Sequence, residues 1–407
     1  MQTYLVGGAV RDRLLGRDTQ DLDWVVVGAN PQIMLAQGFL PVGKDFPVFL
    51  HPKTRQEYAL ARTERKIAQG YAGFAFYADS DVTLEQDLMR RDLTINAMAQ
   101  AADGTIIDPF GGQDDLKNKC LRHVSPAFAE DPVRVLRTAR FAARYDFEVA
   151  PETMQLMQNM VAAGECHALV AERVWQELAK GLCEPFPAKM IEILRESGCL
   201  KVISPELEQL FGVPQNPAHH PEIDAGIHTL LVLQQTAVCN LSLAERYAAL
   251  LHDLGKGITP KNLLPKHRGH DLAGVPLVQA VNQRLRAPKA CAELAELVCR
   301  WHIVIHSLRE LSSEQVLDVL RQTDALRRPE RFEQLLNVCR ADSQGRLHHE
   351  NAPYPQHEAW QNLLAAIKQV PQKSIAQQHQ SQPQHIAQAI YQAQLAAIEA
   401  VHQPKND

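Results

Sequence analysis

Asp21 and Asp23 are the first residues in the chain that could perform chemistry together, by binding a metal ion. They precede a continuous apolar run, Trp24–Val27, which is typical of a buried strand. Because side chains alternate between the two faces of a strand, carboxylates two residues apart point the same way. Carboxylate oxygens suit Mg²⁺, and two Mg²⁺ ions roughly 3.5–4 Å apart can activate an attacking hydroxyl and neutralise a leaving pyrophosphate. The pair therefore predicts a Mg²⁺ site for nucleotidyl transfer.

Two adjacent glycines lie upstream of this acidic pair. A short apolar strand, Tyr4–Val6, runs into Gly7 and Gly8, and a helix-like run with Arg11 follows. Glycine lets the backbone approach a ligand closely, and the N–H groups at a helix N-terminus favour phosphate. A lone Gly-Gly is usually a turn, and a lone Asp-x-Asp is usually a solvated strand end. Their order and spacing together predict a nucleotidyltransferase in which Gly8 and Arg11 bind the triphosphate.

A second polar segment, RRDLTINAMA, occupies residues 90–99. Asp92 and Asn96 are four residues apart, which predicts that they share one face of a helix. A carboxylate and an amide can bind sugar hydroxyls, and Arg91 can bind phosphate through its guanidinium fork. The alternative is a charged helix N-terminus that binds nothing. Further on, Asp108 with the glycine pair at 111–112 predicts a structural turn.

The segment 130–147, EDPVRVLRTARFAARYDF, carries a stripe of arginines. Pro132 and Asp131 are typical of a helix start. The arginines recur every three or four residues, so they lie on one helix face; they are Arg134, Arg137, Arg140 and Arg144. A solvated, salt-bridged face is the alternative, but the stripe itself contains almost no acidic residues.

Asp131 and Arg134 form a pair that could select a nucleobase. Cytosine and adenine both present an amine donor beside a ring-nitrogen acceptor, whereas guanine and uracil present a carbonyl in place of that amine. One carboxylate acceptor beside one guanidinium donor therefore matches C and A, and leaves unpaired groups against G and U. Each unpaired buried polar group costs about 1–3 kcal/mol, which is enough for discrimination.

A separate constellation lies in the second half of the chain. His228 stands in GIHTLL, and His252 and Asp253 stand in ALLHDLGKG at 249–257, with the His-Asp pair expected on a helix. Imidazoles with carboxylates suit a divalent transition metal such as Ni²⁺, or Mg²⁺. The upstream histidine and LLHDLGKG together resemble the HD metal-dependent phosphohydrolase domain. This resemblance requires a closing aspartate, for which Asp342 in CRADSQGR is the candidate.

Other histidines are weaker candidates for this second site. His270 could serve a second metal, and His302 and His306, four residues apart, could point at the same place. For each of these three, a surface or helix-packing histidine is the more common alternative. The pairs at 219–220 and 348–349 are expected on the surface.

The sequence GGAVRDRLLGRDTQDLDWVV resembles the signature of polymerase-beta-like nucleotidyltransferases, and within them the class II tRNA nucleotidyltransferases and bacterial poly(A) polymerases. EDPVR is similar to the class II amino-acid template EDxxR. The resemblance implies that Asp131 and Arg134 replace a nucleic-acid template. It also implies that the nucleotide pocket is completed by Arg91, Arg137 and Arg140, with Asp92 and Asn96 reading ribose and triphosphate.

Many related sites add a third carboxylate from a neighbouring strand. Glu57, directly before YALA, is the candidate here, and a surface glutamate at a strand edge is an equal alternative.

Head and HD segment together resemble the bacterial CCA-adding enzymes that carry a C-terminal HD domain. The resemblance implies CTP, ATP and tRNA as partners, Mg²⁺ for nucleotide transfer, and phosphatase, 2′-nucleotidase and 2′,3′-cyclic phosphodiesterase activities in the HD domain. A bacterial poly(A) polymerase, an HD phosphohydrolase with an RNA-binding head, and an enzyme that adds only part of CCA remain alternatives. The acidic net charge of −5 argues against a strongly basic, non-specific nucleic-acid binder.

The sequence predicts an α+β protein: a small mixed head followed by an all-helical remainder. Strands are expected at Tyr4–Val6, Asp21–Val27, Phe46–Leu50, Tyr58–Ala61 and Thr105–Ile107, and almost none after residue 120. The expected divisions are a head (1–118), a helical neck and body (119–215), an HD domain (216–330) and a helical tail (331–407). Residues 369–385, rich in Gln and His, are expected to be loosely ordered, before a further helix.

Composition limits the class of protein and the cellular compartment that can be expected. The chain has 407 residues, 45% hydrophobic and 22% charged, as in ordinary globular proteins. No apolar run approaches the roughly 20 residues of a membrane span, and no signal peptide is visible. The eight cysteines form no CxxC pair, which favours reduced thiols in a cytoplasmic protein. A monomer and a homodimer are both compatible with these features.

Overall fold

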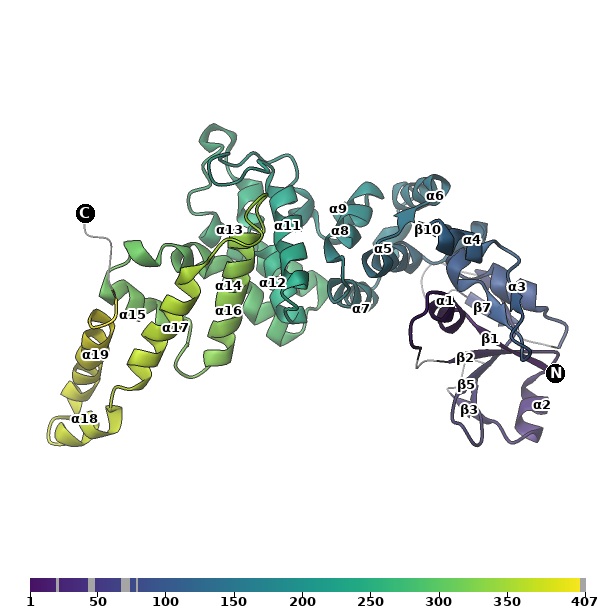
Figure 1. Ribbon diagram of the computed structural model, residues 1–407, viewed down its shortest axis with the longest axis horizontal. Coiled ribbons are helices and arrows are strands. Elements are labelled where there is room, and N and C mark those ends of the chain that lie inside the picture. The colour runs from purple at the N-terminus through teal and green to yellow at the C-terminus, as the bar shows by residue number, and fades with distance from the viewer. Residues whose placement is uncertain (20–21, 43–47, 67–73, 78–79, 403–407) are drawn as a thin grey trace. The chain divides into compact units, whose positions relative to one another are not determined.

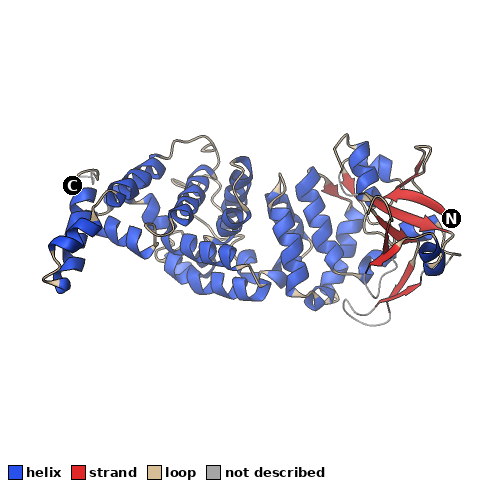
Figure 2. Cartoon of the chain, turned by 90° about the horizontal axis from the view of Figure 1, so that it is seen from below, coloured by secondary structure: helices blue, strands red, loops and turns tan. Residues whose placement is uncertain are grey.

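The computed structural model describes residues 1–19, 22–42, 48–66, 74–77 and 80–402. The chain divides into two compact units, Met1–Ile203 and Ser204–Asp407 (Figure 1). Strands belong to the first unit, and the described part of the second is helical (Figure 2). Among the described residues, no helix has both the length and the apolar character needed to cross a bilayer.

The head of the first unit is built on a seven-stranded sheet with the order β3-β4-β5-β2-β1-β8-β9. Strands β2 and β5 run parallel, and the other neighbours are antiparallel. The strands are β1 (Gln2–Val6), β2 (Asp23–Val27), β3 (Leu40–Val42), β4 (Val48–Leu50), β5 (Glu57–Leu60), β8 (Ala99–Gln100) and β9 (Ile106–Ile107). A separate hairpin pairs β6 (Thr63–Lys66) with β7 (Phe74–Tyr77).

The five predicted strands correspond to β1, β2, β4, β5 and β9, with ends that shift by one or two residues. The predicted start of the second strand, Asp21, and the predicted start of the third, Phe46, lie outside the described residues. The prediction missed the short strands β3 and β8 and the hairpin, because two to four residues leave too short a pattern to detect.

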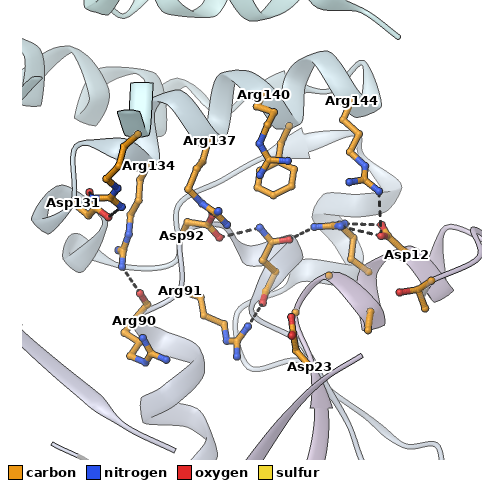
Figure 3. A pocket seen from close by; sticks show the side chains of 18 of the residues that line it. Asp12, Asp23, Arg90, Arg91, Asp92, Asp131, Arg134, Arg137, Arg140 and Arg144 are labelled. Carbon is orange, nitrogen blue, oxygen red and sulfur yellow. Dashed lines mark hydrogen bonds and ion pairs between the residues drawn. The ribbon is translucent and has the colours of Figure 1, made fainter. Parts of the chain in front are cut away.

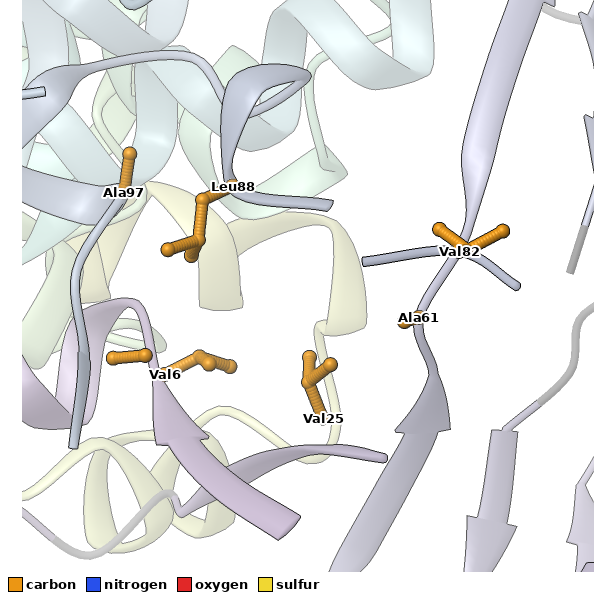
Figure 4. Close-up of a cluster of buried hydrophobic side chains, with 7 residues drawn as sticks. Val6, Val25, Ala61, Val82, Leu88 and Ala97 are labelled. Carbon is orange, nitrogen blue, oxygen red and sulfur yellow. The ribbon is translucent and has the colours of Figure 1, made fainter. Parts of the chain in front are cut away.

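Both faces of the sheet are buried. Val25 belongs to a cluster with Val6, Leu88 and Ala97 (Figure 4). Its neighbour Val26 belongs to a cluster on the other face. Alternating side chains on a strand covered from both sides explain why Trp24–Val27 is continuously apolar. The head helices are α1 (Gly8–Leu14), α2 (Pro31–Ala36), α3 (Leu84–Met89) and α4 (Gly112–Lys117).

The rest of the first unit is a helical layer organised around α5. This helix packs against α7 and α8. The helices are α5 (Val133–Tyr145), α6 (Pro151–Ala162), α7 (Ala171–Leu182), α8 (Pro187–Glu196) and α9 (Cys199–Ile203). Two residue pairs, β10 (Cys120–Leu121) and β11 (Glu148–Val149), form the one parallel ladder described after residue 120. The predicted near-absence of strands is therefore confirmed.

The second unit contains α10 to α19. Its helices are α10 (Pro205–Glu208), α11 (Ala225–Val238), α12 (Leu243–Leu251), α13 (His270–Leu285), α14 (Lys289–His306), α15 (Ser313–Gln322), α16 (Pro329–Gln344), α17 (Pro355–Lys368), α18 (Gln372–Gln378) and α19 (Pro383–Glu399).

The expectation of loose order over 369–385 is wrong, because α18 and the start of α19 occupy this segment. The predicted final helix is confirmed as α19. The finer four-part division of the chain stays a prediction.

Leu88 offers a direct test of the head core, since it is fully buried in the cluster of Figure 4. Leu88→Ala should destabilise the first unit by about 2–5 kcal/mol, through lost transfer energy and the cavity that remains. Hydrogen exchange of the β1 and β2 amides measures this loss of stability, and the measurement does not require the two units to unfold in a single transition. Met89→Ala, at a neighbouring exposed side chain, is the control and should change protection little. Equal effects of the two substitutions would contradict the described core.

Candidate active sites

A polar cavity of about 650 Å³ lies in the first unit. Among the described residues that line it, nine are arginines and five are aspartates. They are Arg11, Arg62, Arg90, Arg91, Arg134, Arg137, Arg140, Arg144, Arg173, Asp12, Asp18, Asp23, Asp92 and Asp131, with Gly7, Gly8, Ala9, Thr19, Asn96 and Phe141. The arginines of α5 project from one side, and Asp23 lies on the opposite side (Figure 3). This charge pattern suits a polyanion that also carries a metal ion.

The turn between β1 and α1 requires glycine. Gly7 has φ 68°, and a Cβ there would lie 2.7 Å from Nη1 of Arg91. Its neighbour Gly8 also lines the cavity. Arg91 is held by Asp87, with Nη2 3.3 Å from Oδ2. The backbone turn and the guanidinium therefore pack directly on each other, as the predicted triphosphate site needs.

Arg11 is buried at 4% exposure. Its Nε lies 2.9 Å from Oδ1 of Asp12, and Nη1 donates to the side chain of Asn96. Its Cζ lies 5.1 Å from the ring centroids of both Phe141 and Tyr145. Arg11 therefore lines the cavity and also ties α1 to α5.

Asp12 is a functional neighbour that the sequence analysis missed. It accepts hydrogen bonds from Arg11, from the Tyr145 hydroxyl at 2.8 Å, and from Arg144 Nη2 at 3.4 Å. Burial raises the pKa of Asp12, but the bond and charge of Arg11 outweigh this and hold it below the ordinary value. Burial also raises the pKa of Tyr145, to about 12. The carboxylate therefore stays charged and the phenol stays a donor at neutral pH.

Asp92 and Asn96 lie side by side, but not on one face of a helix as predicted. Helix α3 ends before Arg90, and a short 3₁₀ turn, Thr94–Asn96, follows. Leu93 pairs with His123 in a β-bridge, which holds the backbone extended and rules out the predicted helix. Asn96 Nδ2 donates to Asp92 Oδ1 at 2.9 Å.

Asp92 also joins the arginine helix. Arg137 Nε donates to Asp92 Oδ2 at 2.7 Å. Burial raises the pKa of Asp92, but the charge of Arg137 and the hydrogen bond from Asn96 lower it far below the ordinary value. Asp92, Asn96 and Arg137 thus form one fixed polar surface of the cavity.

Asp131 and Arg134 line the same cavity, and each side chain is held by other groups. The Arg134 guanidinium donates to the carbonyls of Ala127 at 2.8 Å and Arg90 at 2.7 Å. Asp131 Oδ1 accepts from the backbone N–H of Val133, the first residue of α5, at 3.0 Å. These bonds fix both side chains in place, as a base-reading pair requires.

Arg173 on α7 is a second residue that the sequence analysis missed. Its Nη1 and Nη2 lie 3.3 Å and 2.8 Å from the two carboxylate oxygens of Asp131. This bidentate pair sets the plane of the carboxylate. Four residues on, Glu177 accepts from Arg140 Nε at 2.6 Å, while Arg140 Cζ lies 4.4 Å from the Phe141 ring centroid. The acidic partners of the arginine stripe therefore exist, but come from distant parts of the chain.

Asp23 is the first residue of β2 and is exposed to the cavity. It stands directly opposite Glu57 on the parallel strand β5, so the two side chains share a face of the sheet. Glu57 is not among the residues that line the cavity. Asp21 lies outside the described residues, and its pairing with Asp23 stays a prediction.

The second cluster lies in the other unit and joins four helices. His228 (α11) has Nε2 3.0 Å from Oδ1 of Asp342 (α16), and His252 Nε2 lies 3.8 Å from the same oxygen. These three residues converge closely enough to hold a metal ion. A second convergent group consists of Asp253, His270 and His302.

Asp253 links the two groups. His252 Nε2 lies 3.2 Å from its Oδ2, and His270 Nε2 lies 3.1 Å from its Oδ1. His302 Nε2 lies 3.5 Å from Oδ1. His252 and Asp253 follow the end of α12 and do not lie within a helix as predicted, because His252 is the C-cap and a 3₁₀ turn begins at Leu254.

Three imidazoles of the cluster, those of His252, His270 and His302, use Nδ1 for a fixed contact and direct Nε2 inward. Nδ1 of His252 contacts Ala249 O at 2.7 Å, and Nδ1 of His270 contacts His267 O at 2.6 Å. His302 bonds backbone carbonyls of its own helix. Such contacts fix the tautomer that leaves Nε2 free as a metal ligand.

A further observation supports a divalent cation in this cluster. His252 Nε2 and both oxygens of Asp253 are buried, and their contacts with one another, with His270 and with the Lys256 ammonium, 2.5 Å from Oδ2, do not reach full hydrogen-bond geometry among the described residues. Burial raises the pKa of Asp342, but hydrogen bonds from His228 and His306 lower it well below the ordinary value. Buried polar atoms without hydrogen bonds are costly, so their convergence here indicates a cation site.

The structure places His306 and His220 closer to the metal-ligand cluster than the sequence analysis expected. His306 Nε2 lies 2.7 Å from Oδ2 of Asp342, so it belongs to the cluster. His220 is not on the surface, because it packs on the His228 ring at 4.6 Å and bonds Glu222 at 3.0 Å. His219 and the pair at 348–349 are exposed, as expected.

Family comparisons cover most of the chain. Residues 3–122 match the family model described as the poly A polymerase head domain. Residues 146–211 match the probable RNA and SrmB-binding site of polymerase A, and residues 226–342 match the HD domain. The HD match ends at Asp342 itself.

Full-length relatives are more specific. A multifunctional CCA protein of Neisseria meningitidis serogroup A is 68% identical over 400 residues, covering 98% of this chain and 96% of the relative. One from Chromobacterium violaceum is 60% identical over 376 residues, covering 92% of each. Among solved structures, the Bacillus stearothermophilus CCA-adding enzyme in complex with CTP has a TM-score of 0.65 at 24% identity, covering 98% of this chain and 89% of that one.

The Thermotoga maritima CCA-adding enzyme complexed with tRNA has a TM-score of 0.60 at 18% identity, covering 99% of this chain and 88% of that one. At these identities, the solved structures establish the fold.

A nucleotidyltransferase head with an arginine-lined cavity, followed by an HD domain with a histidine–aspartate cluster, defines a two-site transferase and hydrolase class. Within that class, the chain belongs to the family of multifunctional CCA proteins, which are CCA-adding nucleotidyltransferases. This assignment confirms the CCA-adding prediction over the poly(A) polymerase alternative, although the head model carries the latter name.

Proposed function

We propose that the first unit adds the 3′-terminal CCA to tRNA from CTP and ATP, with release of pyrophosphate and without a nucleic-acid template. The main support for this proposal is the cavity of the first unit, whose lining combines Asp23 with a wall of arginines and the Asp131–Arg173 pair. Similar proteins have been solved with CTP, with ATP and with tRNA.

Nucleotide binding would use the two sides of this cavity. Asp23, with Asp21, would hold Mg²⁺, which on binding supplies charge neutralisation at the reacting phosphate. The triphosphate would lie along the Gly8 turn, within reach of the guanidinium groups described above. These are Arg11, Arg91, Arg137 and Arg140, whereas Asp92 and Asn96 face the ribose.

Transfer needs little covalent chemistry from the protein. The tRNA 3′-hydroxyl attacks the α-phosphate in line, and pyrophosphate leaves. Positioning and charge neutralisation supply most of the rate. The ion pairs of α5 hold the arginines in place before the nucleotide arrives, so little reorganisation is required.

Base selection would come from Asp131 and Arg134. The carboxylate accepts the exocyclic amine of cytosine or adenine, and the guanidinium donates to the ring nitrogen. Arg173 orients the Asp131 carboxylate through its two guanidinium contacts. Uracil and guanine would present a carbonyl to that carboxylate, with no proton between them.

The HD cluster would hydrolyse phosphate esters at damaged tRNA ends, as a phosphatase, 2′-nucleotidase and 2′,3′-cyclic phosphodiesterase. Its ligands would be His228, His252, Asp253 and Asp342, with His270 and His302 able to hold a second ion. A divalent transition metal such as Ni²⁺, or Mg²⁺, matches these nitrogen and oxygen donors. With tRNA as substrate, we place the enzyme in the cytoplasm, as a monomer or homodimer.

One assay tests the whole proposal. Purified protein, tRNA lacking CCA, and each labelled nucleoside triphosphate in turn are incubated with Mg²⁺, and product lengths are read on a gel. The proposal requires two additions with CTP alone and a third only when ATP is added. A poly(A) ladder with ATP alone would overturn it.

Asp23→Asn should lower the rate of nucleotide addition by at least about 100-fold, because it removes a charged metal ligand. Phosphatase activity should persist, since that site is built from other residues. His252→Ala is the reciprocal variant and should lose phosphatase activity while it keeps nucleotide addition. Loss of both activities in either variant would contradict two separate centres.

Asp131→Asn should relax base selection. The amide places a donor where the carboxylate accepts, so the preference for CTP over UTP in kcat/KM should fall by about 10-fold or more. Asp114→Asn, an exposed change on α4, is the matched control. Unchanged rejection of UTP and GTP by the Asp131 variant would rule out the carboxylate as a base reader.

A further inference from the structure

Phe141 is the one aromatic side chain among the described residues that line the cavity of the first unit, and it is 3% exposed. A buried phenylalanine on a helix ordinarily packs among apolar neighbours in a core. Here three guanidinium groups lie against one ring. Their Cζ atoms are 4.4 Å (Arg140), 5.1 Å (Arg11) and 5.6 Å (Arg137) from the ring centroid. All three distances fall within the roughly 6 Å at which the face of a ring attracts a cation.

Each of these three arginines also directs its Nε at a carboxylate. The Nε–oxygen distances are 2.9 Å for Arg11 and Asp12, 2.7 Å for Arg137 and Asp92, and 2.6 Å for Arg140 and Glu177. A carboxylate bonds in the plane of a guanidinium group, which leaves the flat face available to an aromatic ring. The carboxylates are therefore spread over separate parts of the chain, whereas the ring is common to all three arginines.

Tyr145 holds the Phe141 ring in place. The two residues are four apart on α5, and their ring centroids are 6.2 Å apart with the planes inclined by 11°. The Tyr145 hydroxyl donates to Asp12 of α1 at 2.8 Å, which ties the stacked pair to the head. Tyr145 has arginine neighbours of its own, since the Cζ atoms of Arg17 and Arg144 lie 4.8 Å and 5.3 Å from its centroid.

A ring in this place solves a physical problem of the cavity. Guanidinium groups gathered at one place repel one another, and each long side chain loses rotamer freedom when a ligand immobilises it. The face of an aromatic ring carries negative potential, so it attracts each cation and restricts its rotamers before a ligand arrives. An aliphatic side chain of similar volume would fill the space without that attraction.

We propose that Phe141 is a positioning residue for the triphosphate of CTP and ATP, and that the face of its ring holds Arg11, Arg137 and Arg140 ready for the phosphate oxygens. The inference rests on the proposed nucleotide-adding function of this unit. Base selection is assigned to Asp131 and Arg134, which other groups hold. A weaker ring should therefore lower the affinities for CTP and ATP alike and leave the preference for CTP over UTP unchanged.

The test varies the electron density of the ring with little change in its shape. Phenylalanine analogues with one, two or five ring fluorines are incorporated at position 141 of the full chain, and Phe141→Leu removes the ring. Affinities for CTP, ATP, UTP and inorganic triphosphate are measured by calorimetry with Mg²⁺ and without tRNA. The same fluorinated series at Phe49 is the matched control, because Phe49 is also 3% exposed but belongs to the cluster on the other face of the sheet.

The proposal predicts that CTP, ATP and inorganic triphosphate bind more weakly with each added fluorine. The loss should reach about 3-fold to 30-fold for the pentafluoro analogue and for Phe141→Leu. The Phe49 series should bind as the unsubstituted chain does. Normal binding by the pentafluoro analogue would show that the ring acts through its volume alone and would refute the proposal, even if Phe141→Leu bound weakly. A lost preference for CTP over UTP with unchanged triphosphate binding would also refute it, since the ring would then act on the base.

Failure of the positioning role and failure of the proposed function give different results. If the unsubstituted chain bound CTP and extended tRNA lacking CCA while the position-141 series showed no change, only the positioning role would be refuted. If the unsubstituted chain neither bound CTP nor extended such a tRNA, the nucleotide-adding function would be refuted as well. Melting curves check the folding of each variant, and the fluorinated series decides the question if Phe141→Leu does not fold.

Discussion

The first unit depends on charge pairing between buried carboxylates of the head and partly exposed arginines of α5. Asp12 and Asp92 on the head side are matched by Arg144 and Arg137 on the helix side. The two carboxylates are buried, whereas each guanidinium keeps about a third of its surface exposed, so loss of a guanidinium would leave a buried carboxylate charge uncompensated. The pairs therefore fix the position of α5 more than they add net stability, and the width of the cavity follows from that position.

Arginine is suited to this arrangement because its planar guanidinium can keep one structural contact and still present further N–H groups. Arg11 shows the principle, since it bonds Asp12 and Asn96 while it packs against two aromatic rings. The second unit reaches a comparable result with imidazoles. There, backbone carbonyls take up Nδ1 of His252, His270 and His302, and Nε2 is left for the centre. In both units, one contact orients a side chain and another atom of it is directed inward.

The sequence predicted those features that lie within one local pattern. The α5 stripe, the β1–α1 turn and the strand that begins at Asp23 are confirmed, because periodicity and glycine placement act over a few residues. The helix predicted for Asp92 and Asn96 is wrong, because the β-bridge at Leu93 is a tertiary contact that spacing cannot show. The contact between the two side chains formed nevertheless.

Partners that are distant in the chain could not be predicted. Asp131 meets Arg173 on another helix, and Asp12 meets Tyr145 across 133 positions. The spacing of Arg173 and Glu177 on one face of α7 was the available signal, and it indicated an exposed ion pair equally well. His306 likewise joins the metal-ligand cluster only because the fold brings Asp342 beside it.

The central claim is that one cavity of protein side chains reads both cytosine and adenine. Equilibrium competition tests this most directly: labelled CTP is bound to the full chain with Mg²⁺ and without tRNA, and ATP, UTP or GTP is then titrated in. The account predicts one CTP site in the first unit, complete displacement by ATP, and at least about 10-fold weaker displacement by UTP and GTP. Simultaneous binding of CTP and ATP at separate sites, or displacement by UTP as effective as by ATP, would contradict it.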